Sequence, residues 1–360
     1  MDAINSISVD HVLSRVHQQK IMKILIFSPA WVGDMVMAQS LFKSLHQQYE
    51  DLTLDVISPP WVYGLLQRMP EVNCHYKIDV QRGKFGWTVR RNLGKQLQKN
   101  KYDQVITMPV TWKSALTGYW CATSKRTGYL GEMRYGLLTD KRKMDKEQLP
   151  YMVQRYVYLG LDADSKIPEL NEIPKPQLSV DMANVAEWQT KLGLNKGKKL
   201  IALMPGAEFG PAKRWPTEKY AAIAKELTQE GCEVILLGSP NDFATAHEIE
   251  AKSGCQLMSL CGKTSLLDAI DLLSCVDLAI SNDSGLMHIA AALNIPQIAI
   301  YRSSTPEFTP PLNDKAVILQ AELELPTADR IKLKSLDGVE GFSDVSVDSV
   351  RSVIQHLIKE

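Results

Sequence analysis

Short apolar segments of four to six residues recur along this 360-residue chain, and longer segments with helical periodicity separate them. In the first half they cover residues 23–27, 52–57 and 104–108, and in the second half 200–203, 233–237, 276–280 and 297–301. Continuous apolar runs of this length are typical of strands buried on both faces, and helical crossovers make such strands parallel. The alternation therefore predicts an α/β chain of doubly wound parallel sheets.

A proline-rich segment divides the chain. Residues 167–176 contain three prolines and no helical period, which is typical of a linker. The predicted parts are an N-terminal extension (1–21), a Rossmann-like domain (22–170), the linker (171–177), a second Rossmann-like domain (178–345) and a closing helix (346–360). We expect the closing helix to pack back on the first domain. Two domains of this kind place a ligand cleft between them.

Charge is distributed unevenly, although the net charge is zero. Residues 22–176 hold 22 Lys and Arg against 15 Asp and Glu, whereas residues 177–360 hold 17 against 24. Within the basic half, residues 81–102 carry seven basic side chains and no acid, with Phe85 and Trp87 among them. This segment is either a solvated basic helix face or a contact with an anionic lipid surface.

Several classes of protein are not expected from the composition. The six cysteines form no C-x-x-C pair, and the seven histidines show no zinc-binding spacing, so we expect neither a metal nor a cofactor. No apolar run approaches the roughly 18–20 residues of a membrane span, and residues 1–21 lack the apolar core of a signal peptide. We therefore expect a cytoplasmic protein, and nothing in the sequence predicts a nucleic-acid partner.

A polar cluster follows the predicted strand 276–280. A helix that opens near Asp283 or Ser284 and buries its apolar stripe places His288 on the same face as Ser284, one turn later. In open α/β sheets, ligands bind at the carboxyl ends of strands, and helix N-termini there favour anions. The alternative is that Asp283 only caps the helix and that His288 only lies on the surface.

A second polar loop, residues 204–216, lies between a predicted strand and a predicted helix. Its glycines and prolines fix an irregular backbone, and Lys213 and Arg214 supply adjacent cations that suit a pyrophosphate. Ser303 and Asp34 also follow predicted strands. Together the residues of the second half describe a nucleotide-diphosphate site, and the absence of G-x-G-x-x-G after the first strand disfavours a dinucleotide.

Segments 31–34, 131–138, 206–216, 282–288 and 308–312 resemble the motifs of the heptosyltransferases, glycosyltransferase family 9. The resemblance implies two Rossmann-like domains of the GT-B glycosyltransferase fold and an inverting, metal-independent transfer. It also implies ADP-L-glycero-D-manno-heptose as the donor and heptosyl-Kdo-lipid A as the acceptor. Such a reaction belongs to lipopolysaccharide core synthesis, on the cytoplasmic face of the inner membrane of a Gram-negative bacterium.

The same resemblance assigns roles to single residues. Asp34 matches the general base, and Lys213 matches the cation that neutralises the leaving diphosphate. Asp242 matches an acid that holds the ribose, and Thr264 matches a contact to adenine. The other expected donor contacts are Gly33, Gly206, Arg214, Asp283, Ser284, Gly285, His288 and Ser303. Contacts to the acceptor are expected at Lys113, Arg126 and Arg134, mainly because of their charge.

One position departs from the family pattern. Arg302 stands where glycine is usual, and its side chain either adds a cation at the phosphates or narrows the site. Retention of configuration is not expected, because retaining enzymes of this fold use glutamates in a region where none occurs between Glu250 and Glu307. Three alternatives stay open: a heptosyltransferase for another core acceptor, a nucleotide-sugar 2-epimerase, and a non-catalytic protein that binds anionic glycolipid.

Overall fold

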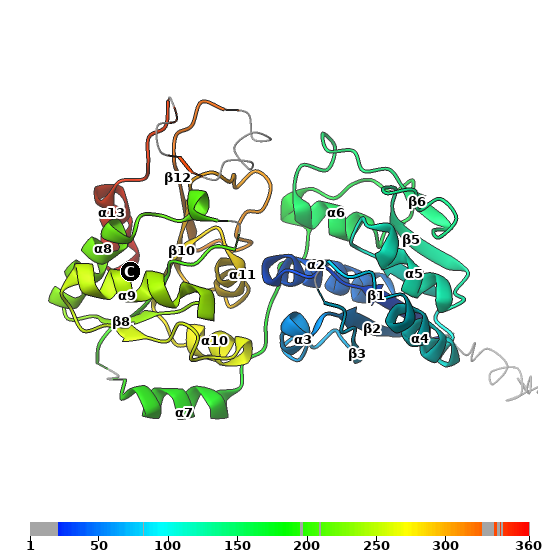
Figure 1. The fold of residues 1–360 in the computed structure, drawn as a ribbon, viewed down its shortest axis with the longest axis horizontal. Coiled ribbons are helices and arrows are strands. Elements are labelled where there is room, and N and C mark those ends of the chain that lie inside the picture. The colour runs from blue at the N-terminus through cyan, green and yellow to red at the C-terminus, as the bar shows by residue number, and fades with distance from the viewer. Residues whose placement is uncertain are drawn as a thin grey trace, which may run out of the picture.

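Two lobes of similar architecture lie side by side in the computed structural model (Figure 1). The described residues are 21–81, 83–194, 197–208, 210–325, 335–336, 339 and 341–359. The predicted extension therefore lies outside them except for Ile21, as does Arg82 of the basic segment. None of the described helices combines the length and the apolar character that crossing a bilayer requires.

The N-lobe contains six parallel strands with helices on both faces of the sheet. Its elements are β1 (Met22–Phe27), α2 (Val32–Gln48), β2 (Leu52–Ser58), α3 (Pro60–Leu66), β3 (Cys74–Lys77), α4 (Trp87–Leu97), η1 (Gln98–Asn100), β4 (Gln104–Thr107), α5 (Trp112–Trp120), β5 (Lys125–Tyr129), β6 (Asp140–Arg142) and α6 (Met152–Tyr158). The strand order is β3-β2-β1-β4-β5-β6. The centre of the sheet is apolar because β1 and β4 are covered on both faces.

The C-lobe repeats this arrangement after a short turn, η2 (Leu170–Glu172). Its elements are α7 (Met182–Leu192), β7 (Leu200–Met204), η3 (Pro211–Lys213), α8 (Thr217–Gln229), β8 (Glu233–Leu236), η4 (Pro240–Asp242), α9 (Phe243–Ser253), β9 (Met258–Ser259), α10 (Leu266–Leu273), β10 (Leu278–Asn282), α11 (Gly285–Ala292), β11 (Gln297–Tyr301), β12 (Ala316–Gln320) and α13 (Val347–Lys359). The strand order is β12-β11-β10-β7-β8-β9, and neighbouring strands are parallel. The predicted α/β class with two doubly wound parallel sheets is confirmed.

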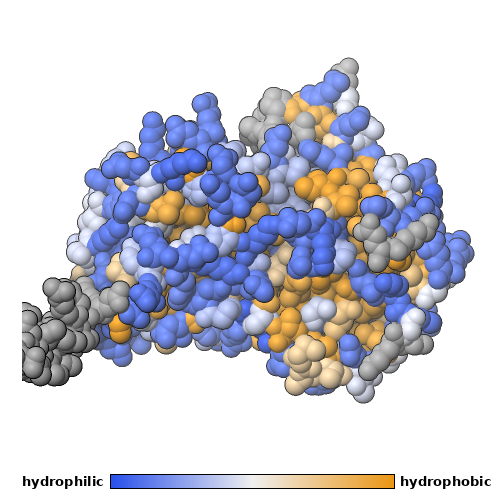
Figure 2. Space-filling view, turned by 180° about the vertical axis from the view of Figure 1, so that it is seen from behind, coloured by the Kyte–Doolittle hydropathy of each residue, from blue (hydrophilic) through white to orange (hydrophobic). Residues whose placement is uncertain are grey.

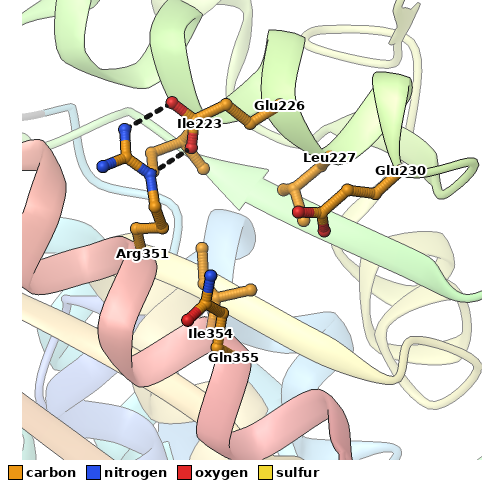
Figure 3. Close-up of a pocket in the computed structure, with 7 residues that line it drawn as sticks. All are labelled: Ile223, Glu226, Leu227, Glu230, Arg351, Ile354 and Gln355. Carbon is orange, nitrogen blue, oxygen red and sulfur yellow. Dashed lines mark hydrogen bonds and ion pairs between the residues drawn. The ribbon is translucent and has the colours of Figure 1, made fainter.

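The closing helix α13 packs on the C-lobe, so the expectation that it returns to the first domain is wrong. Val350 and Ile354 join the apolar core that contains Ile223 and Leu227 of α8. Arg351 forms two hydrogen bonds to the Glu226 carboxylate on α8, beside a small hollow between the two helices (Figure 3). None of the predicted site residues lines this hollow.

The two lobes contact each other through α2 and α11, which face one another at the centre of the molecule (Figure 1). Near the linker, the guanidinium of Arg68 in the N-lobe forms an ion pair with the buried Asp271 on α10. The backbone N–H of Asp181, just before α7, donates to the same carboxylate. Seen from behind, hydrophilic residues cover most of the N-lobe, and larger hydrophobic areas lie on the C-lobe (Figure 2).

Candidate active site

The loops at the carboxyl edge of the C-lobe sheet bring most of the predicted donor residues into one row. Ser303 follows β11, Asp283 follows β10, Gly206 and Lys213 follow β7, Asp242 follows β8, and Thr264 follows β9. Because these strands are neighbours in this order, the residues succeed one another along a single edge. An edge of this kind accommodates an elongated ligand at the switch point of an α/β sheet.

Lys213 and Asp283 form an ion pair at the centre of this row. The Nζ of Lys213 lies 2.6 Å from Oδ2 of Asp283, and both side chains are largely buried. The sequence analysis predicted both residues as donor contacts but did not predict the pairing. The Asp283 carboxylate holds the Lys213 ammonium at the carboxyl edge of the sheet. A diphosphate bound here would share the ammonium with Asp283 or displace Asp283 from it.

The loop after β7 is held against the loop after β8. Oδ2 of Asp242 accepts hydrogen bonds from the backbone N–H and the hydroxyl of Ser239, and Arg214 lies 3.8 Å from Oδ1. A Cβ added at Gly206 would lie 2.5 Å from the same carboxylate, so this position requires glycine. Asp242 thus orders both loops, whatever its contact with a ligand.

Two further donor residues lie at the ends of the row. The hydroxyl-bearing residues after β11 are buried, and Oγ of Ser304 next to Ser303 has no partner among the described residues. Thr264 is half-buried and directly precedes Ser265, the N-cap of α10. A buried hydroxyl without a partner is costly, which makes the end near Ser303 receptive to a polar ligand group.

The N-terminus of α11 meets the N-lobe. Ser284 is its N-cap, and the Ser284 side chain forms no capping hydrogen bond. A Cβ added at Gly285 would lie 2.8 Å from Val32, and one added at Gly33 would lie 2.6 Å from Cδ2 of His288. His288 is therefore buried against the N-lobe, and the alternative that it only lies on the surface is wrong. Burial lowers the pKa of His288 to about 4, although the Asp283 charge opposes this, so the imidazole is neutral near neutral pH.

Asp34 lies in the first turn of α2, beside the contact between Gly33 and His288. Its Oδ1 accepts a hydrogen bond of 2.8 Å from the hydroxyl of Tyr156 on α6. Burial raises the pKa of Asp34, and the Tyr156 hydrogen bond opposes that rise. Asp283 raises and Lys213 lowers the same pKa, so the charges of the C-lobe site act on Asp34 across the interface.

Tyr156 is a site residue that the sequence analysis missed. It is buried, and both burial and the nearby Asp34 charge raise its pKa well above the ordinary value, so the hydroxyl keeps its proton and donates. The residue stands on a short helix whose spacing offered no sign of chemistry. The proximity of the hydroxyl to Asp34 follows only from the packing of α6 on α2.

The Arg302 guanidinium is held by Asp344 and by the backbone of the loop that carries Lys213, which disagrees with the expectation that it adds a cation at the phosphates. Its Nε lies 2.9 Å from Oδ1 of Asp344, and its Nη1 donates to the backbone carbonyl of Arg214 at 2.6 Å. Lys219 also pairs with Asp344. Arg302 therefore braces the back of the loop that carries Lys213.

The three residues expected to contact the acceptor have different surroundings. Arg134 is fully buried and donates to the carbonyls of Pro109 and Tyr129, so its assignment as an acceptor contact is wrong. Arg126 lies near the amino end of β5 and donates to two backbone carbonyls, away from the edge that carries Asp34. Lys113 alone is half-buried near the carboxyl edge, in the first turn of α5.

Comparison with solved structures defines the class of this fold. The solved structure of Escherichia coli ADP-heptose LPS heptosyltransferase II matches this chain with a TM-score of 0.81 and 37% sequence identity. The match covers 94% of this chain and 99% of that one. A family 9 glycosyltransferase from Veillonella parvula matches with a TM-score of 0.82 at 17% identity, which shows the fold alone. The two lobes thus form a GT-B glycosyltransferase fold.

Sequence comparison identifies the family. Residues 90–339 match the profile of Glycosyltransferase family 9 (heptosyltransferase). Lipopolysaccharide heptosyltransferase 2 of E. coli K12 is 40% identical over 335 residues, which cover 91% of this chain and 94% of that protein. Lipooligosaccharide heptosyltransferase 2 of Haemophilus influenzae is 41% identical over 337 residues, 91% of this chain and 95% of that protein. The chain belongs to glycosyltransferase family 9, the heptosyltransferases, as the motifs predicted.

Proposed function

We propose that this chain transfers L-glycero-D-manno-heptose from ADP-heptose to the first heptose of heptosyl-Kdo-lipid A, with inversion and without a metal. The observation that carries this proposal is the row of donor residues along the C-lobe sheet, whose central pair, Lys213 and Asp283, lies near enough to Asp34 of the N-lobe to act on its pKa. The names of relatives that cover more than nine-tenths of the chain support the same reaction, since they are heptosyltransferases numbered 2.

The donor lies along the row in the order that the sheet imposes. Adenine is placed near Thr264 and the ribose near Asp242, at the end of the row formed by β9 and β8. The diphosphate lies at Lys213, where an ammonium offsets the charge that develops on the leaving ADP. The heptose then lies toward α11 and the N-lobe. This order uses every loop between β9 and β11.

The chemical step is a single displacement. The carboxylate of Asp34 accepts the proton of the attacking acceptor hydroxyl, whose oxygen bonds to the anomeric carbon as the bond from that carbon to the phosphate oxygen breaks. ADP leaves toward Lys213 with the bonding electron pair. A carboxylate with a raised pKa is a better general base, and such help is typically worth about 10²–10⁴ in rate.

The location of the acceptor sets the location of the enzyme. We propose cytoplasmic, peripheral contact with the inner membrane, since the acceptor is a lipid-anchored sugar. The excess of Lys and Arg over Asp and Glu in residues 22–176 supports contact with anionic lipid.

The test is transfer in vitro. ADP-heptose is incubated with deacylated core acceptors that carry no heptose, one heptose or two, and product masses are measured with and without EDTA. We expect one added heptose only on the single-heptose acceptor, at an EDTA-independent rate. Asp34→Asn should abolish turnover while ADP-heptose still binds. Addition to another acceptor would indicate a sibling enzyme, and conversion of the donor without acceptor would indicate the epimerase.

A further inference from the structure

Four aromatic rings form a continuous stack on the N-lobe. The ring of Phe85 lies 4.8 Å from Trp112 at the start of α5 and 5.7 Å from Trp87 at the start of α4. The ring centroids of Trp87 and Trp120 lie 4.7 Å apart, and the two rings are nearly perpendicular. Half of Trp87 (50%) and nearly half of Trp112 (42%) are exposed. Large exposed rings that support one another form a preorganised apolar surface.

A strained loop presents further apolar side chains. Glu132 and Met133 both have left-handed backbone conformations, with φ of 41° and 53°, which non-glycine residues seldom adopt. This conformation leaves Met133 89% exposed and Tyr135 65% exposed. Between them, the buried Arg134 fixes the loop through its hydrogen bonds to backbone carbonyls. Strain of this kind persists where surrounding contacts impose it, and it clusters at functional sites.

The loop and the ring stack belong to one surface. The backbone N–H of Trp112 donates to Oε2 of Glu132 at 2.9 Å, and Nη1 of Arg134 donates to the carbonyl of Pro109 at 2.7 Å. Pro109 directly precedes Val110, which is itself 43% exposed. We call the surface formed by Phe85, Trp87, Val110, Trp112, Met133 and Tyr135 the aromatic surface.

Basic residues border the aromatic surface. Lys84 precedes Phe85, and Arg91 lies one helical turn after Trp87; both side chains are exposed. Glu132, which directly precedes Met133, accepts the hydrogen bond from the backbone N–H of Trp112. Exposed Trp, Tyr and aliphatic side chains beside Lys and Arg are the composition that binds the interface of an anionic bilayer.

The position of the aromatic surface matches the reaction. Val110 follows β4 and the loop of Met133 follows β5, so both lie at the carboxyl edge of the N-lobe sheet. Asp34 follows β1, which is the neighbour of β4 in that sheet. A lipid-anchored acceptor whose sugar reaches Asp34 would therefore extend along this edge toward the aromatic surface.

We propose that the aromatic surface seats the enzyme on the anionic phospholipid bilayer, with Trp87, Trp112 and Met133 entering the headgroup region. The proposal rests on the proposed function for the direction from which the acceptor arrives. It names which face of the N-lobe meets the membrane and which side chains do so.

The test is sedimentation with vesicles of phosphatidylglycerol and phosphatidylethanolamine that contain no lipopolysaccharide. We expect the wild-type chain to sediment with them, and weakly with phosphatidylcholine vesicles. The double variant Trp112→Ala, Met133→Asp should lose about tenfold or more in partitioning, because it removes apolar contact and adds a negative charge. The charge reversal Lys84→Glu, Arg91→Glu should also weaken vesicle binding. High salt should restore part of the binding of this variant, because it screens the repulsion between the new carboxylates and the anionic lipid.

A matched control is Phe243→Ala on the C-lobe, since Phe243 is 56% exposed but lies outside the aromatic surface. It should sediment like the wild type, and every variant should keep the wild-type thermal unfolding transition. Transfer to the deacylated acceptor is measured in parallel and should be unchanged in the double variant.

The outcomes separate the two proposals. Equal sedimentation of wild type and double variant, or none by the wild type, would overturn the membrane-seating proposal while leaving transfer to the soluble acceptor intact. A double variant that keeps vesicle binding but loses transfer would also overturn it, because the surface would then bind acceptor sugars. Absence of transfer by the wild type would refute the proposed function whatever the vesicles show.

Discussion

Replacement of Tyr156 by phenylalanine removes a single hydrogen bond to the proposed base and keeps the ring in place. The Tyr156 hydroxyl donates to Oδ1 of Asp34 at 2.8 Å. A hydrogen bond to a charged group contributes about 1.5–3 kcal/mol, which corresponds to a roughly 10- to 150-fold change in the balance between carboxylate and carboxylic acid. The hydrogen bond opposes the effect of burial, which raises the pKa of Asp34. Its loss therefore raises that pKa further, and the base is protonated up to a higher pH.

The assay is kcat as a function of pH at saturating substrates. We expect the acid limb of the Tyr156→Phe profile to move to higher pH, with the two profiles converging in alkaline solution where Asp34 is ionised in both. The matched control is Tyr158→Phe on the same helix, whose hydroxyl donates to the carbonyl of Ala163 at 2.9 Å. An unmoved acid limb, or a rate lowered equally at every pH, would refute the view that Tyr156 sets the ionisation of Asp34.

Three other predictions concern the interface and the donor row. Lys213→Ala should weaken ADP binding by about 1.5–3 kcal/mol in calorimetry; unchanged affinity would contradict the diphosphate position. Gly33→Ala places a Cβ 2.6 Å from His288 and should destabilise the fold by about 1–3 kcal/mol and reduce turnover, whereas Gly136→Ala, with nothing within 4 Å, should do neither. Because the pKa of His288 falls from 6.5 to about 4 on folding, the unfolded state binds its proton first as pH falls. Wild type should therefore lose about 3 kcal/mol more stability than His288→Asn between neutral pH and pH 4 in urea unfolding; equal losses would exclude this linkage.

Seven strands were predictable because each is a largely apolar run, whereas β3, β5, β6 and β9 are polar or very short and were not predicted. The segment predicted at 297–301 is β11 without change, and β1 and β7 each extend the predicted run by one residue. The start of α2 at Val32 was not predictable. Trp31 makes no side-chain cap hydrogen bond, so the usual signal for a helix start was absent.

The charged partners were not predictable from local pattern. Lys213 and Asp283 are 70 residues apart, and Tyr156 is 122 residues from Asp34. Arg134 was expected to contact the acceptor mainly because of its charge, yet it is buried and donates to backbone carbonyls. A cation can be buried only where acceptors such as carbonyl oxygens surround it, and the positions of these carbonyls are determined by the fold of the loop. The loops that carry Asp283, Lys213 and Ser303 were predicted, in contrast, because each follows an apolar strand, whereas Asp242 and Thr264 were assigned from the family resemblance.

The order of those loops along the C-lobe sheet also means that the site can select ligands by their length. Four strand spacings separate β11 from β9, which at about 4.8 Å each is roughly 19 Å. Only a molecule that is extended on this scale can touch Thr264 and Ser303 together. A free sugar phosphate reaches one end and adenosine the other, so we expect each alone to bind far more weakly than the two joined by a diphosphate. Selectivity for the intact donor would then reside in the width of the sheet, and single contacts at its edge would contribute little to it.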